Sequence, residues 1–292
     1  MTDAILQHAR GVIERGSLSF TLASRLLDSV TRAGSHQLYA WCRHCDDVID
    51  GQTFGHDMQV PETGEQRRLL AGLRDQTERA LRGETVSDPV FMGIARVVHQ
   101  HGIPPHHLAE FLLGMEMDVE GRRYQTIDEL AVFCYRVAGV VGVMMAHIMG
   151  VKDAATLKRA GDLGTGMQFT NIARDVADDA AVGRVYLPFD WLTEAGLAPE
   201  QVADPAWRPV VVALVGRLLD HGESYYRQAD QGIEHLSFRN AWSIRAARLI
   251  YSEIATVIRR RGANAWDTRS SVPAWRKLQL VAVALGRTLG PS

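Results

Sequence analysis

Two acidic segments of this chain combine the composition of a helix with carboxylates that share one helical face. The first runs from Tyr39 to Asp50 and the second from Gln168 to Asp179, and neither contains Gly or Pro. Residues three or four positions apart lie on the same face of a helix. The residues along or beside these two stripes are Tyr39, Arg43, Asp46, Asp47 and Asp50, and then Gln168, Asn171, Asp175, Asp178 and Asp179. The fold must therefore accommodate two lines of negative charge.

Apolar neighbours argue against a purely solvated explanation of these stripes. Trp41 borders the first stripe, and Phe169 borders the second. A buried carboxylate is costly unless it is paired or binds a metal. One Asp cluster at a helix end is equally consistent with a solvated surface, but two such stripes favour bound cations. Hard oxygen ligands select Mg²⁺, Mn²⁺ or Ca²⁺, and Mg²⁺ is commonly held by carboxylates together with substrate phosphates. Arg43 and Arg174 lie in phase to bind such phosphates.

Helical periodicity runs through almost the whole chain of 292 residues, and no strand alternation competes with it. Asp88-Pro89 and the capping box that begins at Thr126 mark helix starts, and Gly51 ends the first acidic helix. With helices of about 10–14 residues, the chain is predicted to form roughly ten of them. The expected fold is all-α, in a single domain spanning residues 1–292.

Several local predictions concern the surroundings of the stripes. A helix capped by Ser17 or Ser19 is expected to run through residues 22–30, and the next is expected to span residues 34–50. Residues 52–64 form a loop and are the best early candidate for a mobile flap. Residues 65–82 are strongly charged and are expected to form a solvent-facing helix.

Two further predictions concern the middle of the chain. Glu116 and Asp118 are predicted to be surface acids. Gly139 and Gly142 interrupt an apolar helix, where each costs about 1 kcal/mol relative to Ala. They are expected to permit close helix packing or the approach of an apolar ligand.

Composition excludes several classes of function. The formal net charge is −2, and no basic stripe with interleaved aromatic residues is present, so nucleic acid is not an expected partner. Three cysteines give no disulfide framework and fit a reduced, cytoplasmic protein. The N-terminus does not resemble a signal peptide, and the apolar run of residues 137–149 is too short to cross a bilayer. The protein is expected to be soluble or peripheral to a membrane.

The stripes also suggest a type of chemistry. Two carboxylate-bound cations on facing helices would grip a diphosphate and stabilise it as a leaving group. An allylic hydrocarbon that loses this group becomes a carbocation, which needs an apolar, aromatic and dry cavity. The apolar helix around Tyr135 is a plausible wall. The residues alone therefore predict Mg²⁺-dependent chemistry on an isoprenoid diphosphate.

The sequence resembles the squalene/phytoene synthase family, and its bacterial phytoene-forming members most closely. The matching stretches, in family order, are Ser17-x-Ser19-Phe20, the Tyr39–Asp50 segment, Tyr135-x-Val-Ala-Gly-x-Val-Gly142, the Gln168–Asp179 segment, Gly183-Arg-Val-Tyr-Leu-Pro188, Tyr251 and Trp266-Asp-x-Arg269. Together they span most of the chain and are highly specific. Many relatives carry Glu where this chain has Asp178, which leaves the role of that residue open.

The resemblance implies an isoprenoid synthase helical bundle with a central cavity. It also implies the head-to-head condensation of two geranylgeranyl diphosphates to phytoene through prephytoene diphosphate, with Mg²⁺ and without NADPH. The implied metal ligands are Asp46, Asp50, Asn171, Asp175 and Asp179. The implied contacts to diphosphate or the reacting carbons are Ser17, Ser19, Tyr39, Arg43, Tyr135, Gln168, Arg174, Tyr251 and Arg269. Asp47 and Asp178 fit their motifs but are expected to face away from the metals.

Three alternatives remain open at the level of sequence. A squalene or dehydrosqualene synthase would use C15 donors, and squalene formation would consume NADPH. The glycine-rich stretch at residues 161–166 follows no strand and is not a dinucleotide-binding loop, which mildly favours phytoene. A terpene cyclase is disfavoured by Arg174-Asp175 and by the Ser17-x-Ser19 element. The alternative without catalysis is a helical scaffold with degenerate acids.

Overall fold

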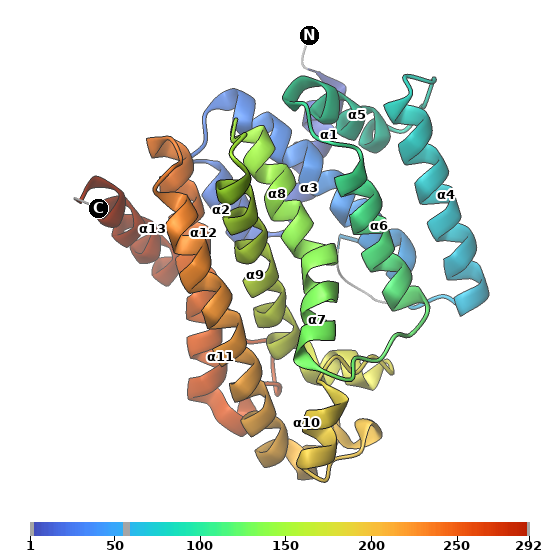
Figure 1. Cartoon of the computed structure of the whole chain (residues 1–292), viewed down its shortest axis with the longest axis vertical. Helices are drawn as coiled ribbons and strands as arrows, with labels where there is room; N and C mark the ends of the chain where they lie inside the picture. Colours follow the sequence, from blue (N-terminus) through green and yellow to red (C-terminus); the bar gives the residue numbers. More distant parts are fainter. Residues whose placement is uncertain (1–2, 55–58, 291–292) are drawn as a thin grey trace.

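The computed structural model describes residues 3–54 and 59–290, which form helices joined by short connections (Figure 1). The helices are α1 (Ala4–Gly16), α2 (Leu18–Ser24), α3 (Ser29–Asp50), α4 (Thr63–Leu81), α5 (Pro89–His101), α6 (His106–Val119), α7 (Ile127–Cys134), α8 (Val140–Ile148), α9 (Ala154–Ala181), α10 (Phe189–Glu194), α11 (Arg208–Ile233), α12 (Phe238–Arg261) and α13 (Ala274–Leu289). A π-helical turn, η1 (Tyr135–Gly139), joins α7 to α8, and 3₁₀ turns lie at Pro199–Gln201 (η2), Pro205–Trp207 (η3) and Gly262–Asn264 (η4). The predicted all-α class is confirmed.

Helix α9 is the central element of the bundle, and it carries the second acidic stripe. It packs against α11 and α12 on one side and against η1 and α8 on the other. Figure 1 shows α13 outside α12 at one edge of the molecule and α4 at the opposite edge. Helix α3, which carries the first acidic stripe, packs against α1, α5 and α8. The two stripes therefore lie on different helices of one bundle, with α8 in contact with both.

Glycines allow the backbones of η1 and α8 to approach the backbone of α9 closely. A Cβ atom added to Gly164 would lie 2.1 Å from the carbonyl oxygen of Ala138, and one added to Gly142 would lie 2.3 Å from that of Ala160. Real Cβ atoms do not come this close to backbone atoms. The prediction that glycines in this helix permit close packing is confirmed for Gly142.

The chain breaks between α2 and α3, where the apolar periodicity of the sequence suggests that a helix continues. The expected helix through residues 22–30 ends at Ser24, and α3 begins at Ser29 rather than at residue 34. The Asp28 side chain accepts hydrogen bonds from the backbone N–H groups of Val30 and Thr31, and it thereby caps α3. Ser17 caps α2 by accepting from the N–H of Phe20.

The region after the first acidic helix matches its predictions in part. Gly51 adopts a left-handed conformation with φ of 59° and ends α3, as expected. Of the loop predicted at residues 52–64 as a mobile flap, residues 55–58 lie outside the described part of the chain, and α4 begins at Thr63. Helix α4 buries Leu70 and Leu73 against the core, while its charged side chains face outward.

One apolar helical stretch is longer than the sequence suggested. The continuous helix Ile127–Ile148 has 22 residues, and its most apolar window of 18 residues has a mean hydropathy of 1.7, so its length and composition would allow it to cross a membrane. Half of that window is buried inside the protein. The predicted run of residues 137–149 therefore underestimates the apolar length.

Candidate active site

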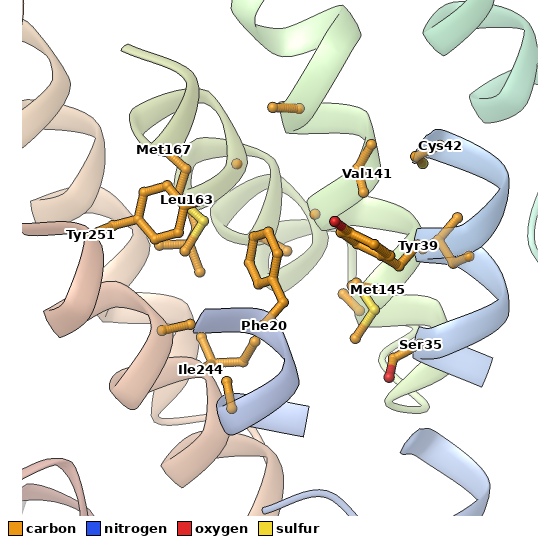
Figure 2. Close-up of a pocket in the computed structure, with 18 of the residues that line it drawn as sticks. Phe20, Ser35, Tyr39, Cys42, Val141, Met145, Leu163, Met167, Ile244 and Tyr251 are labelled. Atoms are coloured by element: carbon orange, nitrogen blue, oxygen red, sulfur yellow. The ribbon is translucent and has the colours of Figure 1, made fainter. Parts of the chain in front are cut away.

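A cavity of about 380 Å³ lies between α2, α3, α8, α9 and α12. This volume falls in the usual range of about 300–1,000 Å³ for small-molecule sites. Most of its wall is apolar, and Figure 2 shows Phe20, Val141, Met145, Leu163, Met167 and Ile244 around it. Polar side chains from the two acidic stripes line another part of the same wall. The cavity therefore has two parts, an apolar chamber and a charged region.

Helix α3 contributes Tyr39, Arg43 and Asp46 to the charged region. The Arg43 guanidinium lies 5.9 Å from the centre of the Tyr39 ring and 3.8 Å from the Asp46 carboxylate. Burial raises the pKa of Asp46 to about 7, although Arg43 opposes this shift. A cation bound beside Asp46 would favour its ionised form.

Helix α9 contributes Gln168, Asn171 and Arg174 from the opposite side. The Asn171 amide nitrogen donates to Gln168 Oε1 at 3.1 Å. Arg174 donates to both oxygens of Asp175, at 2.9 Å and 2.5 Å. Arg269, from the segment after α12, also donates to Asp175, at 3.4 Å. The second stripe is thus held by two arginines on its cavity side.

Three buried polar atoms in the charged region have no hydrogen-bond partner among the described residues. They are the Tyr39 hydroxyl, Arg43 Nε and Asn171 Oδ1. Buried polar groups are rarely left unpaired, because each costs about 1–3 kcal/mol. The Asn171 oxygen fits a hard cation, and the Arg43 nitrogen fits a phosphate oxygen. These residues therefore fit a diphosphate bound with Mg²⁺.

Aromatic side chains connect the charged region to the apolar chamber. Phe20 stacks on Tyr251 with ring centres 5.7 Å apart, and its edge faces Tyr39 at 6.1 Å. All three rings line the cavity, as Figure 2 shows. Burial raises the pKa of both tyrosines, so each keeps its proton. Their neutral faces are suited to lie beside a developing carbocation.

The segment after α12 is anchored so that Arg269 reaches the site. The Trp266 indole nitrogen donates to the carbonyl oxygen of Ala173 in α9, at 3.1 Å. Arg269 lies three residues later, lines the cavity and remains 56% exposed. Ser17 also lines the cavity, whereas Ser19 is not part of its wall.

Five of the six acids of the motifs lie outside the cavity lining, and one of them, Asp175, pairs with the lining residues Arg174 and Arg269. Asp50 lies one turn beyond the lining residue Asp46, Asp179 lies one turn beyond Asp175, and both are partly buried. Burial, together with the charge of Asp175, raises the pKa of Asp179 well above its usual range. Asp47 accepts a hydrogen bond from the N–H of Phe54, and Asp178 is exposed. Neither of the latter two residues is part of the cavity lining.

Tyr135 does not lie where the resemblance placed it. Its side chain is 39% exposed and lines a separate hollow with Lys158 and Asp162. The ring packs over the glycines at which η1 meets α9, and its Cδ2 lies 2.6 Å from where a Cβ of Gly139 would be. This packing turns Tyr135 away from the main cavity.

Asp118 is not a surface acid, which corrects the prediction from the sequence. Its carboxylate accepts a hydrogen bond from the Tyr186 hydroxyl at 2.9 Å, and burial raises its pKa to about 7. Arg184 lies nearby and donates to Asp50 at 2.5 Å. Glu116, in contrast, pairs with Arg74 at 2.8 Å and is partly exposed. The only sequence signal for the Asp118 cluster was the Gly183–Pro188 stretch, for which no roles were predicted.

The carboxylates of the two stripes are engaged with arginines rather than gathered around one point. Among residues 3–54 and 59–290, no group of three or more His, Cys, Asp or Glu side chains is arranged to hold a metal ion. Mg²⁺ does not require such a group, because one or two carboxylates and the oxygens of a bound diphosphate complete its shell. The donor set therefore suits cations that arrive with a phosphorylated substrate.

Comparison with known proteins identifies the class to which this fold and site belong. Residues 13–276 match the family model for squalene/phytoene synthase, so the chain belongs to that family. The 15-cis-phytoene synthase of Enterobacter agglomerans is 44% identical over 277 residues, which cover 95% of this chain and 94% of that protein. The 15-cis-phytoene synthase of Pantoea ananas is 44% identical over 288 residues, which cover 98% and 93%. The resemblance stated from the sequence is confirmed.

Solved structures with the same fold support this placement. A dehydrosqualene synthase in complex with a ligand aligns with a TM-score of 0.86 and 26% identity, over 97% of this chain and 96% of that one. The squalene synthase HpnC from Alicyclobacillus acidocaldarius aligns with a TM-score of 0.76 and 20% identity, over 88% and 94%. The latter comparison concerns the fold alone.

Proposed function

We propose that this chain condenses two molecules of geranylgeranyl diphosphate head to head and forms phytoene through prephytoene diphosphate, for carotenoid biosynthesis. The observation that carries this function is an apolar cavity whose charged region joins two acidic stripes. The 15-cis-phytoene synthases that are 44% identical over nearly the whole chain support the choice of product. The catalytic unit is one domain spanning residues 1–292.

The charged region binds and orients the two diphosphates. Arg43, Arg174 and Arg269 supply guanidinium donors, and Ser17 and Gln168 add polar contacts at the same wall. Asp46, Asp50, Asn171, Asp175 and Asp179 would hold Mg²⁺, with Mn²⁺ as a substitute. When bound, these ions stabilise the negative charge that builds on the diphosphate as it leaves.

The apolar chamber controls the fate of the carbocation after ionisation. Loss of the first diphosphate breaks its bond to C1 of the donor, and the C2–C3 double bond of the second donor attacks that carbon. Loss of a proton closes the cyclopropyl ring of prephytoene diphosphate. A second ionisation, rearrangement and proton loss give phytoene. Phe20, Tyr39 and Tyr251 present aromatic faces to these cations, and the apolar wall excludes water.

The donor length is tested by a product assay on the purified chain. Geranylgeranyl diphosphate or farnesyl diphosphate is supplied with Mg²⁺ or EDTA, with and without NADPH, and extracted hydrocarbons are identified by mass spectrometry. We expect a C40 product from the C20 donor that requires Mg²⁺ and does not require NADPH. A C30 product from the C15 donor alone would move the assignment to the dehydrosqualene or squalene reaction. No product from either donor would refute the proposed reaction.

We also propose that this enzyme is cytoplasmic and contacts a membrane peripherally, because its product is a water-insoluble hydrocarbon. The outward face of α13 supports this proposal. Trp275, Leu278 and Leu289 lie on that face at helical spacing and are 62%, 60% and 67% exposed. Helix α13 carries Arg276, Lys277 and Arg287 and no acidic residue, although Arg276 pairs with Glu253. Such an apolar face with basic residues fits the surface of an anionic bilayer.

The position of this face also suits product release. Helix α13 packs on α12, where the Trp242 indole nitrogen donates to the carbonyl oxygen of Val281 at 2.9 Å. Helix α12 contributes Ile244 and Ala247 to the cavity wall and carries α13 on its outer side (Figure 1). One helix layer therefore connects the hydrocarbon chamber with the proposed membrane face.

Replacing both Trp275 and Leu278 with serine is expected to weaken vesicle binding at least about tenfold, because each side chain contributes about 1.5–3 kcal/mol when buried. Co-sedimentation with vesicles of phosphatidylcholine and phosphatidylglycerol measures the effect. Serine at Met92 and Val132, which are also exposed but lie on other helices, is the matched control and should bind as the unmodified chain does. If the variant with serine at Trp275 and Leu278 bound vesicles normally but had a changed molar mass in solution, the α13 face would instead be assigned to contact with a second copy of the chain.

A further inference from the structure

Arg184 links the ends of the two acidic helices. It follows α9 by three residues, and Gly183, with φ of 83°, lets the chain turn directly after the helix. Its guanidinium reaches Asp50 at the end of α3 and donates to Oδ1 at 2.5 Å. The two side chains are only 15% and 18% exposed. Arg184 is therefore a fixed positive charge on one of the carboxylates assigned to Mg²⁺.

Other carboxylates surround the same guanidinium. Asp118 of α6 and Asp179 of α9 both lie close enough to Arg184 for its charge to lower their pKa values, against the larger effect of burial. Asp118 is held in place by the Tyr186 hydroxyl. Three acidic residues from three different helices thus share one arginine, and that arginine is paired with Asp50.

We infer that Arg184 is a resident counter-cation that occupies Asp50 until divalent ions bind, and that Asp118 is the anchor to which it then turns. This inference rests on the proposed function, because it requires Asp50 to be a metal ligand. A divalent ion on Asp50 would lie beside the guanidinium, and like charges at that distance repel strongly. Arg184 must therefore leave Asp50, and Asp118 offers a nearby negative partner.

Arg184 and Asp118 are positioning residues in this scheme, and their removal has opposite consequences. Without Arg184, Asp50 is free to bind a cation, so metal affinity should rise. Without the charge of Asp118, the remaining acid near Arg184 is Asp179, which is itself a proposed metal ligand. Arg184 then stays on Asp50, so metal affinity should fall. A purely structural role for both residues would change affinity in the same direction, by loosening the site.

The test is a Mn²⁺ titration of the full chain without any isoprenoid substrate, with inorganic diphosphate held at one concentration and free Mn²⁺ followed by electron paramagnetic resonance. Arg184→Gln is expected to lower the Kd for Mn²⁺ roughly five- to tenfold, the range for losing one partly buried competing ion pair. Asp118→Asn is expected to raise it several-fold, and Arg184→Lys should stay close to the unmodified chain. Arg217→Gln removes a surface pair with Glu194 at 2.7 Å and is the matched control.

Thermal melting in EDTA provides a second readout that does not depend on metal. Arg184→Gln should melt at a lower temperature than the unmodified chain, because the acidic cluster loses its counter-cation, and Mn²⁺ with diphosphate should restore more stability to it. Unchanged or weaker Mn²⁺ binding by folded Arg184→Gln would overturn the inference. Opposite shifts in Kd without any hydrocarbon product would support it and refute the proposed reaction.

Discussion

Replacing Asp46 or Asp175 with alanine is expected to reduce turnover at least about 10³-fold while leaving the helical circular dichroism unchanged. Each carboxylate belongs to a different stripe, and the removal of one charge-stabilising group at a reacting centre typically costs 10²–10³-fold or more. The side chains are 33% and 22% exposed, so neither is a packing element of the core. Steady-state release of diphosphate from geranylgeranyl diphosphate measures the loss.

Asp178→Ala is the matched control for this prediction. Asp178 lies in the same helix as Asp175, one residue before Asp179, but its side chain is exposed. Its replacement removes one negative charge from α9 without removing a proposed ligand. We expect activity within about threefold of the unmodified chain. Near-normal turnover in Asp46→Ala or Asp175→Ala would contradict the metal assignment.

Substituting alanine for Gly164 is expected to destabilise the protein by about 3 kcal/mol or more. The new methyl group would lie 2.1 Å from the carbonyl oxygen of Ala138, and neither helix backbone can move aside cheaply. Gly142→Ala, at 2.3 Å from the carbonyl oxygen of Ala160, should behave similarly. Because Gly142 and Gly164 both line the cavity, separation of α8 from α9 would also disturb the substrate chamber. Urea unfolding followed by circular dichroism measures the free energy of unfolding.

Gly72→Ala is a control for which the opposite change in the free energy of unfolding is expected. It lies inside α4, and a Cβ at this position meets no atom within 4 Å. Alanine there should raise the free energy of unfolding by about 0.5–1 kcal/mol, since glycine is a poor helix former. If Gly164→Ala were as stable as Gly72→Ala, the close approach of η1 and α9 would not hold in solution.

Helices with a local start or stop signal could be predicted from the sequence. Asp88-Pro89 opens α5, Thr126 caps α7 and Gly51 ends α3, as expected. The break between α2 and α3 escaped prediction because apolar periodicity continues across it and no glycine or proline marks it. The Asp28 side chain interrupts the helix there, because it accepts a hydrogen bond from the backbone N–H of Thr31 and so caps a new helix.

The site was predictable where its residues share one helix. Spacing alone placed Tyr39, Arg43 and Asp46 on one face, and the structure has all three on the cavity wall. The pair of Arg184 and Asp50 joins residues 134 positions apart, so no local pattern could indicate it. Asp118 was misassigned for a similar reason, because the partner that buries it, Tyr186, comes from a distant loop.

The π-helical turn η1 determines which face of α8 lies against the cavity. A π turn contains about one residue more than an α turn, and the N–H of Val140 accordingly donates to the carbonyl oxygen of Tyr135, five residues back. If the same five residues were α-helical instead, α8 would be rotated by about 100° relative to α7. Val141 and Met145 would then leave the cavity wall. Deleting one residue at positions 135–139 would instead let an α turn replace the π turn with α8 in its present orientation. Homologous sequences with such a gap are therefore expected to keep the shape of the chamber.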